Sequence, residues 1–142
     1  ELMDQLAQGV MHGGTYNGQA VSMAATVATL RRLRDPATFA GLEARGTRLM
    51  EGMRRHFAEA GIPAVVAGFP TIFHVALGMD QPARDWAGLA GFDRRRYVAF
   101  TTALLRHGVR ALERGAWFLS TEHDEEVVDA TLAAVGRALR EI

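Results

Sequence analysis

The stretch Ala64–Leu77, with the sequence AVVAGFPTIFHVAL, decides the fold class. β-branched and apolar residues fill Ala64–Ala67 and Thr71–Leu77, a composition typical of strands. Gly68-Phe69-Pro70 joins them and contains two residue types that favour turns. Side chains alternate along a strand, so every second residue of the second strand shares a face. One face holds Phe73, Val75 and Leu77, and the other holds Ile72, His74 and Ala76. The stretch predicts an antiparallel pair of strands joined by a short turn.

The segment before this pair predicts a long helix. Asp35-Pro36 marks its start, because an acidic N-cap residue precedes proline at the first helical position. Gly61 and Pro63 mark its end. One face is expected to be buried, because its residues recur at helical spacing: Phe39, Leu42, Gly46, Leu49, Met50, Met53 and Phe57. The interior glycines Gly41, Gly46 and Gly52 each cost about 1 kcal/mol relative to alanine. Close packing against another element would explain them.

The segment after the pair predicts a loop, a helix, two short strands and a last helix. Met79–Gly91 is expected to be a loop with one helical turn. Asp93 caps a third long helix, which ends before Gly108. Two short strands are expected at Val109–Leu112 and Ala116–Leu119, joined by the turn Glu113-Arg114-Gly115. The last helix is expected from about Asp124 to the end.

These elements together predict an α+β fold, in which helices cover a small, mostly antiparallel sheet. The whole chain, residues 1–142, is expected to form a single domain. Residues 1–34 are expected to lead into it, with a short helix at about Glu1–Ala7 and a longer one over Gln19–Arg34. The longer helix is apolar over much of its circumference, so we expect it to be packed on several sides.

Composition excludes several functional classes. The chain has 16 basic and 16 acidic residues, and every basic residue is arginine, so there is no lysine. This excludes a Schiff-base amine, a lysine general base or a P-loop lysine within these residues. The absence of cysteine excludes thiolate catalysis and disulfides. A net charge of zero disfavours nucleic-acid binding, and no apolar run approaches the ~20 residues of a membrane span.

A glycine-rich stretch precedes the second of the two N-terminal helices. It runs His12-Gly13-Gly14-Thr15-Tyr16-Asn17-Gly18. Glycines let backbone N–H groups approach an anion, and a threonine hydroxyl adds a further donor. The spacing matches neither a dinucleotide-binding motif nor a P-loop. Two interpretations therefore stay open, an anion site and an ordinary glycine loop.

The other chemically suggestive groups have simpler structural explanations. The five histidines are scattered, which disfavours a metal site. The acidic run Glu122–Glu126 is expected to be a helix N-terminus rather than a metal site. The arginine runs Arg31–Arg34 and Arg94–Arg96 are expected to be solvated helix faces. Arg114 could bind a substrate carboxylate, but a surface turn residue is the simpler explanation. Ser120 and His123 show no catalytic triad spacing.

Two ordered motifs resemble one enzyme family. His12–Ala25, HGGTYNGQAVSMAA, resembles a glycine-threonine-aromatic segment that in the family leads through Gly-Asn-Pro into an alanine-rich helix. Gly115–His123, GAWFLSTEH, resembles the family's closing motif, which is followed by an acidic helix start. The chain thus resembles the C-terminal part of class III (fold-type I) pyridoxal-phosphate-dependent aminotransferases, nearest to the glutamate-1-semialdehyde 2,1-aminomutase branch.

The resemblance implies specific roles. Gly14 and Thr15 match the residues that bind the cofactor phosphate of the neighbouring subunit in a homodimer. The family's Asn-Pro is replaced here by Gln19-Ala20. The implied cofactor is pyridoxal phosphate, and the implied partners are a second subunit and a small amino substrate, in the cytoplasm. No catalytic residue is assigned in this chain, because the family's Schiff-base lysine and ring-binding residues would precede Glu1.

The resemblance also implies that this chain cannot catalyse alone, because it has no lysine. An alternative from another class stays open. The chain could be a free-standing dimerisation or interaction module without a catalytic role.

Overall fold

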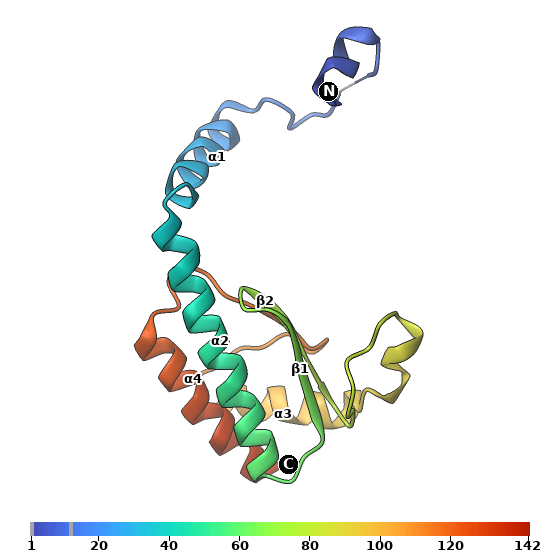
Figure 1. The fold of residues 1–142 in the computed structure, drawn as a ribbon, viewed down its shortest axis with the longest axis vertical. Helices are drawn as coiled ribbons and strands as arrows, with labels where there is room; N and C mark the ends of the chain where they lie inside the picture. Colours follow the sequence, from blue (N-terminus) through green and yellow to red (C-terminus); the bar gives the residue numbers. More distant parts are fainter. Residues whose placement is uncertain (1, 12) are drawn as a thin grey trace. The chain divides into compact units, whose positions relative to one another are not determined.

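The computed structural model describes residues 2–11 and 13–142, and its contacts divide the chain into two compact units, Glu1–Pro36 and Ala37–Ile142. The first unit begins with the 3₁₀ helix Leu2–Gln8, which corresponds to the expected opening helix. It continues through the glycine-rich loop into helix α1, Ala20–Leu33 (Figure 1).

Helix α1 begins and ends close to where the sequence predicts. Gln19 caps its N-terminus, because its side-chain oxygen accepts a 2.7 Å hydrogen bond from the backbone nitrogen of Ser22. The expectation of packing on several sides is wrong for this structure, since α1 contains no buried residue. The other helix described in this unit has only seven residues and offers little surface to cover α1. Apolar side chains therefore stay exposed at Val21, Met23, Val27 and Leu30.

Helix α2, Pro36–Glu59, is the long helix that the sequence predicts. Its expected face is buried at every position except Phe39, whose side chain is 52% exposed. Phe39 lies in the first turn of the helix, one turn before the buried part begins at Leu42. Gly61 follows the helix with a φ of 65°, the left-handed conformation that a glycine adopts readily at a helix C-terminus.

The sheet has three antiparallel strands in the order β1-β2-β3. Strands β1, Ala64–Phe69, and β2, Ile72–Leu77, form a hairpin in which Phe69 pairs with Ile72. The turn is therefore Pro70-Thr71 and not Gly68-Phe69-Pro70 as expected. Gly68 pairs with Phe73 in the ladder and has a φ of 137°, and a side chain there would collide with the backbone of Phe73.

The expected strand at Val109–Leu112 is absent, and so is the hairpin it would have formed. Strand β3, Ala116–Phe118, pairs instead with β2. Two contacts explain this choice: the Val75 nitrogen donates to the Gly115 oxygen at 2.9 Å, and the ring of Trp117 stacks on Phe73 at 6.0 Å. Strand β3 therefore pairs with the free edge of β2 and not with Val109–Leu112.

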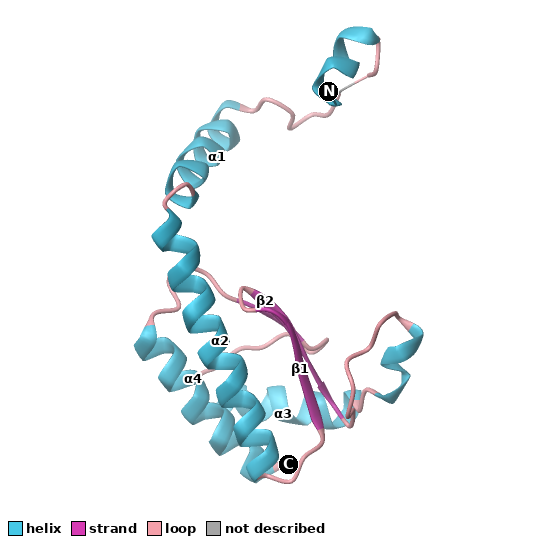
Figure 2. Ribbon diagram, viewed as in Figure 1, coloured by secondary structure: helices cyan, strands magenta, loops and turns pink. Residues whose placement is uncertain are grey.

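Helix α2 and two further helices cover one face of the sheet (Figures 1 and 2). Helix α3, Arg94–Arg106, and helix α4, Glu125–Ala138, are capped by Asp93 and Asp124 as expected. A 3₁₀ turn at Ala87–Gly91 precedes α3, and another at Leu139–Glu141 follows α4. The core between helices and sheet includes Met53, Phe57, Phe73, Val75, Leu77, Tyr97, Phe100, Leu104, Val128 and Val135. The α+β prediction is confirmed.

The second face of the sheet is only partly covered. Phe69, Ile72 and Phe118 are adjacent in the ladder and all exposed. The outer edge of β1 is protected by Arg54 of α2, which donates to the Val66 oxygen through Nε at 3.1 Å and Nη2 at 2.5 Å. Among the described residues, no helix combines the length and apolar character that crossing a membrane requires.

Candidate functional site

The glycine-rich loop of the first unit presents unpartnered hydrogen-bond donors. The Asn17 nitrogen donates to the Gly14 oxygen at 3.0 Å and closes a turn. Within the described part of the chain, the Gly14 and Thr15 backbone N–H groups and the Thr15 hydroxyl bond to no acceptor. Such donors before a helix can bind a phosphate or carboxylate, so these residues fit a phosphate group. His12, the first residue of the motif, lies outside the described residues.

A pocket of about 650 Å³ lies in the second unit. Its walls come from β2, from the 3₁₀ turn at Ala87–Gly91 with its flanking residues, from the start of α3 and from the turn before β3. The chemically distinctive lining residues are His74, Trp86, Phe92, Arg94 and Arg114. Aromatic walls beside guanidinium groups suit a ligand that combines an apolar body with an anionic group.

The two arginines of this pocket carry no counter-charge. Neither Arg94 nor Arg114 forms an ion pair with a described residue. Both also line a second pocket of about 580 Å³, together with Arg110 and Thr102. The sequence predicted Arg94 to lie on a solvated helix face, whereas the structure places it in the walls of both pockets. Arg114 lies in a turn, as predicted, and lines both pockets as well.

His74 connects this pocket to the turn that carries Arg114. Its Nε2 atom lies 2.9 Å from the Arg114 backbone oxygen. Its ring also contacts Phe92, with a centroid distance of 5.7 Å and an interplanar angle of 70°. His74, Trp86 and Phe92 were not predicted as site residues. The available signal was the position of His74 as the polar residue of an otherwise apolar strand face.

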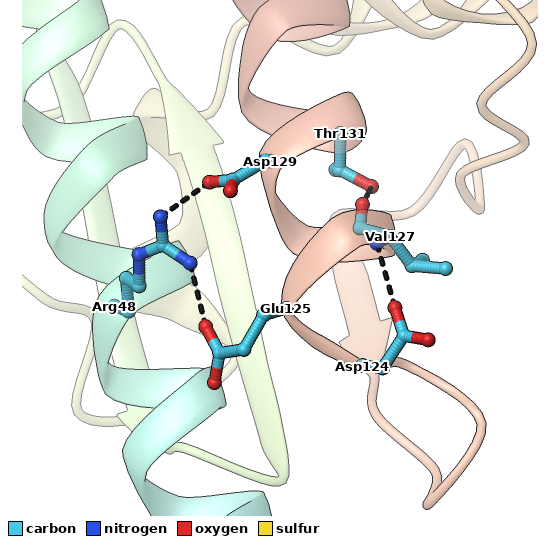
Figure 3. Close-up of polar contacts among 6 residues, drawn as sticks. All are labelled: Arg48, Asp124, Glu125, Val127, Asp129 and Thr131. Carbon is cyan, nitrogen blue, oxygen red and sulfur yellow. Dashed lines mark hydrogen bonds and ion pairs between the residues drawn. The ribbon is translucent and has the colours of Figure 1, made fainter.

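The acidic run before α4 is structural, as the sequence predicted. Asp124 accepts a 2.9 Å hydrogen bond from the Val127 nitrogen and caps the helix (Figure 3). Glu125, at 2.6 Å, and Asp129 both bind the guanidinium of Arg48 and so tie α4 to α2 (Figure 3). No group of three metal-ligating side chains occurs within residues 2–11 and 13–142.

Ser120 and His123 are in contact, but their geometry is that of a turn. The Ser120 hydroxyl lies 3.0 Å from His123 Nδ1. The Ser120 backbone nitrogen also donates to that same Nδ1 at 3.0 Å. The described residues supply no carboxylate that orients the histidine. The pair therefore orders the turn before α4 and does not form a triad.

Solved structures with a similar fold are transaminases. No family model matches the sequence. An omega-transaminase from Sphaerobacter thermophilus has a TM-score of 0.82 and 30% identity, over 93% of this chain and 30% of that structure. The pyridoxal-phosphate internal aldimine form of the FumI protein from a Sphingopyxis species has a TM-score of 0.79 and 26% identity. That match covers 96% of this chain and 30% of that structure. The fold is therefore that found in pyridoxal-phosphate-dependent transaminases.

The sequence relatives of this chain are aminomutases. The glutamate-1-semialdehyde 2,1-aminomutases of Desulfosudis oleivorans and Desulforudis audaxviator are each 33% identical, over 88% and 99% of this chain. The chain spans about a third of the length of these relatives. The predicted resemblance to class III, fold-type I, pyridoxal-phosphate-dependent aminotransferases is thus confirmed over the length of this chain.

Proposed function

We propose that this chain is the C-terminal part of a pyridoxal-phosphate-dependent aminotransferase or aminomutase that acts on an amino acid or amino aldehyde. The observation that carries the proposal is the set of unpartnered donors at Gly14 and Thr15, within the motif that matches the family. The relatives are enzymes of this class, which supports the assignment. The bound cofactor would supply an electron sink for amino-group transfer.

In this proposal the chain binds and orients, and the covalent step depends on a residue outside it. The Gly14 backbone and the Thr15 hydroxyl hold the cofactor phosphate, which belongs to the neighbouring subunit of a homodimer. The lysine that binds the cofactor must come from outside these 142 residues, because they contain none. The exposed apolar side chains of α1 support a contact between that helix and further protein surface.

The pocket of the second unit forms part of the substrate wall. Arg114, with Arg94 beside it, binds a carboxylate of the substrate, since both guanidinium groups are free of ion pairs. Trp86 and Phe92 cover the apolar part of the substrate and exclude water from it. This assignment predicts a preference for amino substrates that carry a carboxylate over those that carry none.

Substitution of Thr15 tests the phosphate site. In the complete enzyme, Thr15→Ala is expected to weaken binding of pyridoxal phosphate by about tenfold or more, because one hydrogen bond to a charged group contributes about 1.5–3 kcal/mol. Thr15→Ser is the control, because it keeps the hydroxyl. Cofactor affinity is measured by equilibrium dialysis.

Two results would contradict the proposal. Equal cofactor affinity in the Thr15→Ala and wild-type enzymes would remove Thr15 from the site. A natural protein that forms a stable dimer and binds no pyridoxal phosphate would favour the dimerisation module instead.

A further inference from the structure

We propose that His74 is a positioning residue, which fixes the turn carrying Arg114 and thereby sets the affinity of the pocket for carboxylates. The inference rests on the proposed function in one respect, the assignment of Arg114 to the substrate carboxylate. It concerns a residue whose side chain lines the pocket but whose polar contact is to the protein backbone.

The hydrogen bond of His74 has a defined direction. A backbone carbonyl oxygen only accepts, so His74 Nε2 carries the proton and donates it to the Arg114 oxygen at 2.9 Å. The imidazole also packs against the ring of Phe92, with 5.7 Å between ring centroids and an interplanar angle of 70°. The ring is therefore constrained both by its donor contact and by packing.

The same turn is held at the next residue as well. The Val75 nitrogen donates to the Gly115 oxygen at 2.9 Å. Consecutive residues of β2, His74 and Val75, thus bind the oxygens of consecutive residues of the turn. A Cβ at Gly115 would lie 2.4 Å from His74 Nε2 and 2.7 Å from the Val75 oxygen, and Gly115 has a φ of 88°. Glycine is required there because the imidazole lies so close.

This attachment matters because the Arg114 side chain is not held by any ion pair within the described residues. The backbone of Arg114 is therefore the part of the residue that is held in place, and His74 contacts that backbone directly. The strand face around His74 is otherwise apolar, with Val65, Ala67 and Ala76 as neighbours. An apolar residue at position 74 would pack equally well there and would leave the Arg114 oxygen without its donor.

The test compares two probes of similar shape, of which one is an anion and the other is neutral. 3-Phenylpropionate carries a carboxylate on an aromatic body, and 3-phenylpropionamide is its neutral counterpart. Each is titrated into the chain, and the indole N–H signal of Trp86, an exposed lining residue, reports binding by NMR. His74→Phe keeps an aromatic ring against Phe92 and removes the donor. His74→Gln restores an N–H at a similar distance.

We expect His74→Phe to weaken binding of the carboxylate by about five- to tenfold, in line with the loss of one hydrogen bond. We expect it to leave binding of the amide unchanged, and His74→Gln to recover carboxylate affinity to within about twofold. A purely structural role would weaken both probes alike in His74→Phe, and that result would overturn the proposal. Wild-type carboxylate affinity in His74→Phe would also overturn it.

Arg114→Ala separates this inference from the proposed function. If this variant leaves the preference for carboxylate over amide unchanged, or if neither probe binds the wild-type chain, the assignment of Arg114 fails and His74 loses its role with it. If Arg114→Ala abolishes the preference and His74→Phe does not alter it, the proposed function stands and the inference about His74 fails.

Discussion

Gly46 and Gly52 show what a single missing side chain does in this fold. A Cβ at Gly46 would lie 2.0 Å from the Pro70 backbone oxygen, and one at Gly52 would lie 2.4 Å from the Leu132 side chain. These glycines let α2 approach the hairpin turn and α4 closely. Gly41 differs, because the atoms its Cβ would meet are the flexible end of Arg45, at 3.1 Å. Close packing was a correct explanation for two of the three glycines.

Gly46→Ala is expected to lower the free energy of unfolding by about 2 kcal/mol or more, because the backbone at Pro70 must move. Gly41→Ala on the same helix is the matched control. It is expected to leave stability unchanged or to raise it by up to about 1 kcal/mol, since alanine is the better helix former. Urea unfolding measures both variants. Equal stability of the two would show that α2 does not need this close approach.

Burial changes the acid–base chemistry of Tyr97. Trp117 Nε1 donates a hydrogen bond to the Tyr97 hydroxyl at 3.0 Å in the core. Burial raises the pKa of Tyr97 to about 12, from 10.0, although the bond from Trp117 acts in the opposite direction. The hydroxyl therefore stays protonated in the folded state at pH values where the unfolded chain loses that proton.

We expect stability to be retained below pH 10 and lost between pH 10 and about 12, because the folded state then binds the proton more tightly than the unfolded state. The chain has no lysine or cysteine and only two tyrosines, so few other side chains titrate in this range. Tyr97→Phe should remove this dependence. It should also lower stability by about 1–3 kcal/mol at neutral pH, because the Trp117 N–H loses its acceptor. Urea unfolding at pH 8, 10 and 11 tests both effects, and an unchanged alkaline slope in the variant would refute the assignment.

At the scale of elements, the C-terminal 3₁₀ turn is attached to the end of α3 by one carboxylate. Glu141 binds Arg106 and, at 2.5 Å, His107 Nε2. Arg137 of α4 donates to His107 Nδ1 at 3.3 Å. The hydrogen bonds from Arg106 and then His107 lower the pKa of Glu141 below its usual 4.5. Helices α3 and α4 are thus linked through this contact at their C-terminal ends.

A carboxylate with a lowered pKa stabilises the folded state above pH 4.5, and this contribution is lost as the pH falls below that value. Glu141→Gln should therefore lower the urea midpoint at pH 7 and reduce its fall between pH 5 and pH 3. Glu126 lies in the first turn of α4, and its side chain makes no hydrogen bond or ion pair with a described residue, so Glu126→Gln is the control. A Glu141→Gln variant that keeps the wild-type acid dependence would exclude this contact as its source.

The sheet shows which elements the sequence could predict. The strands at 64–69 and 72–77 are close in sequence and pair through a short turn, so local pattern predicted them. Strand β3 lies some forty residues further along the chain and pairs with β2 through Val75, Gly115 and the stacking of Trp117 on Phe73. Val109–Leu112 has a similar apolar pattern but gains no partner strand. Local pattern contains no information about which edge is free.

At the scale of the whole molecule, the two units differ in how much they bury. The second unit has a continuous core between three helices and a sheet, whereas α1 in the first unit buries no residue. In the proposed function, the exposed apolar side chains of α1 contact further protein surface.

The sequence by itself determined the α+β class, the helix caps at Asp93 and Asp124, the alternation of side chains along β2 and the resemblance to class III aminotransferases. Each of these follows from neighbouring residues, whose periodicity and turn chemistry are local properties. Only the tertiary structure decided that β3 joins β2 and that His74 meets the Arg114 backbone. It alone also placed Arg94 and Arg114 in shared pocket walls. These residues are separated by 20 to 40 positions, and their contacts exist only once the sheet and α3 have packed.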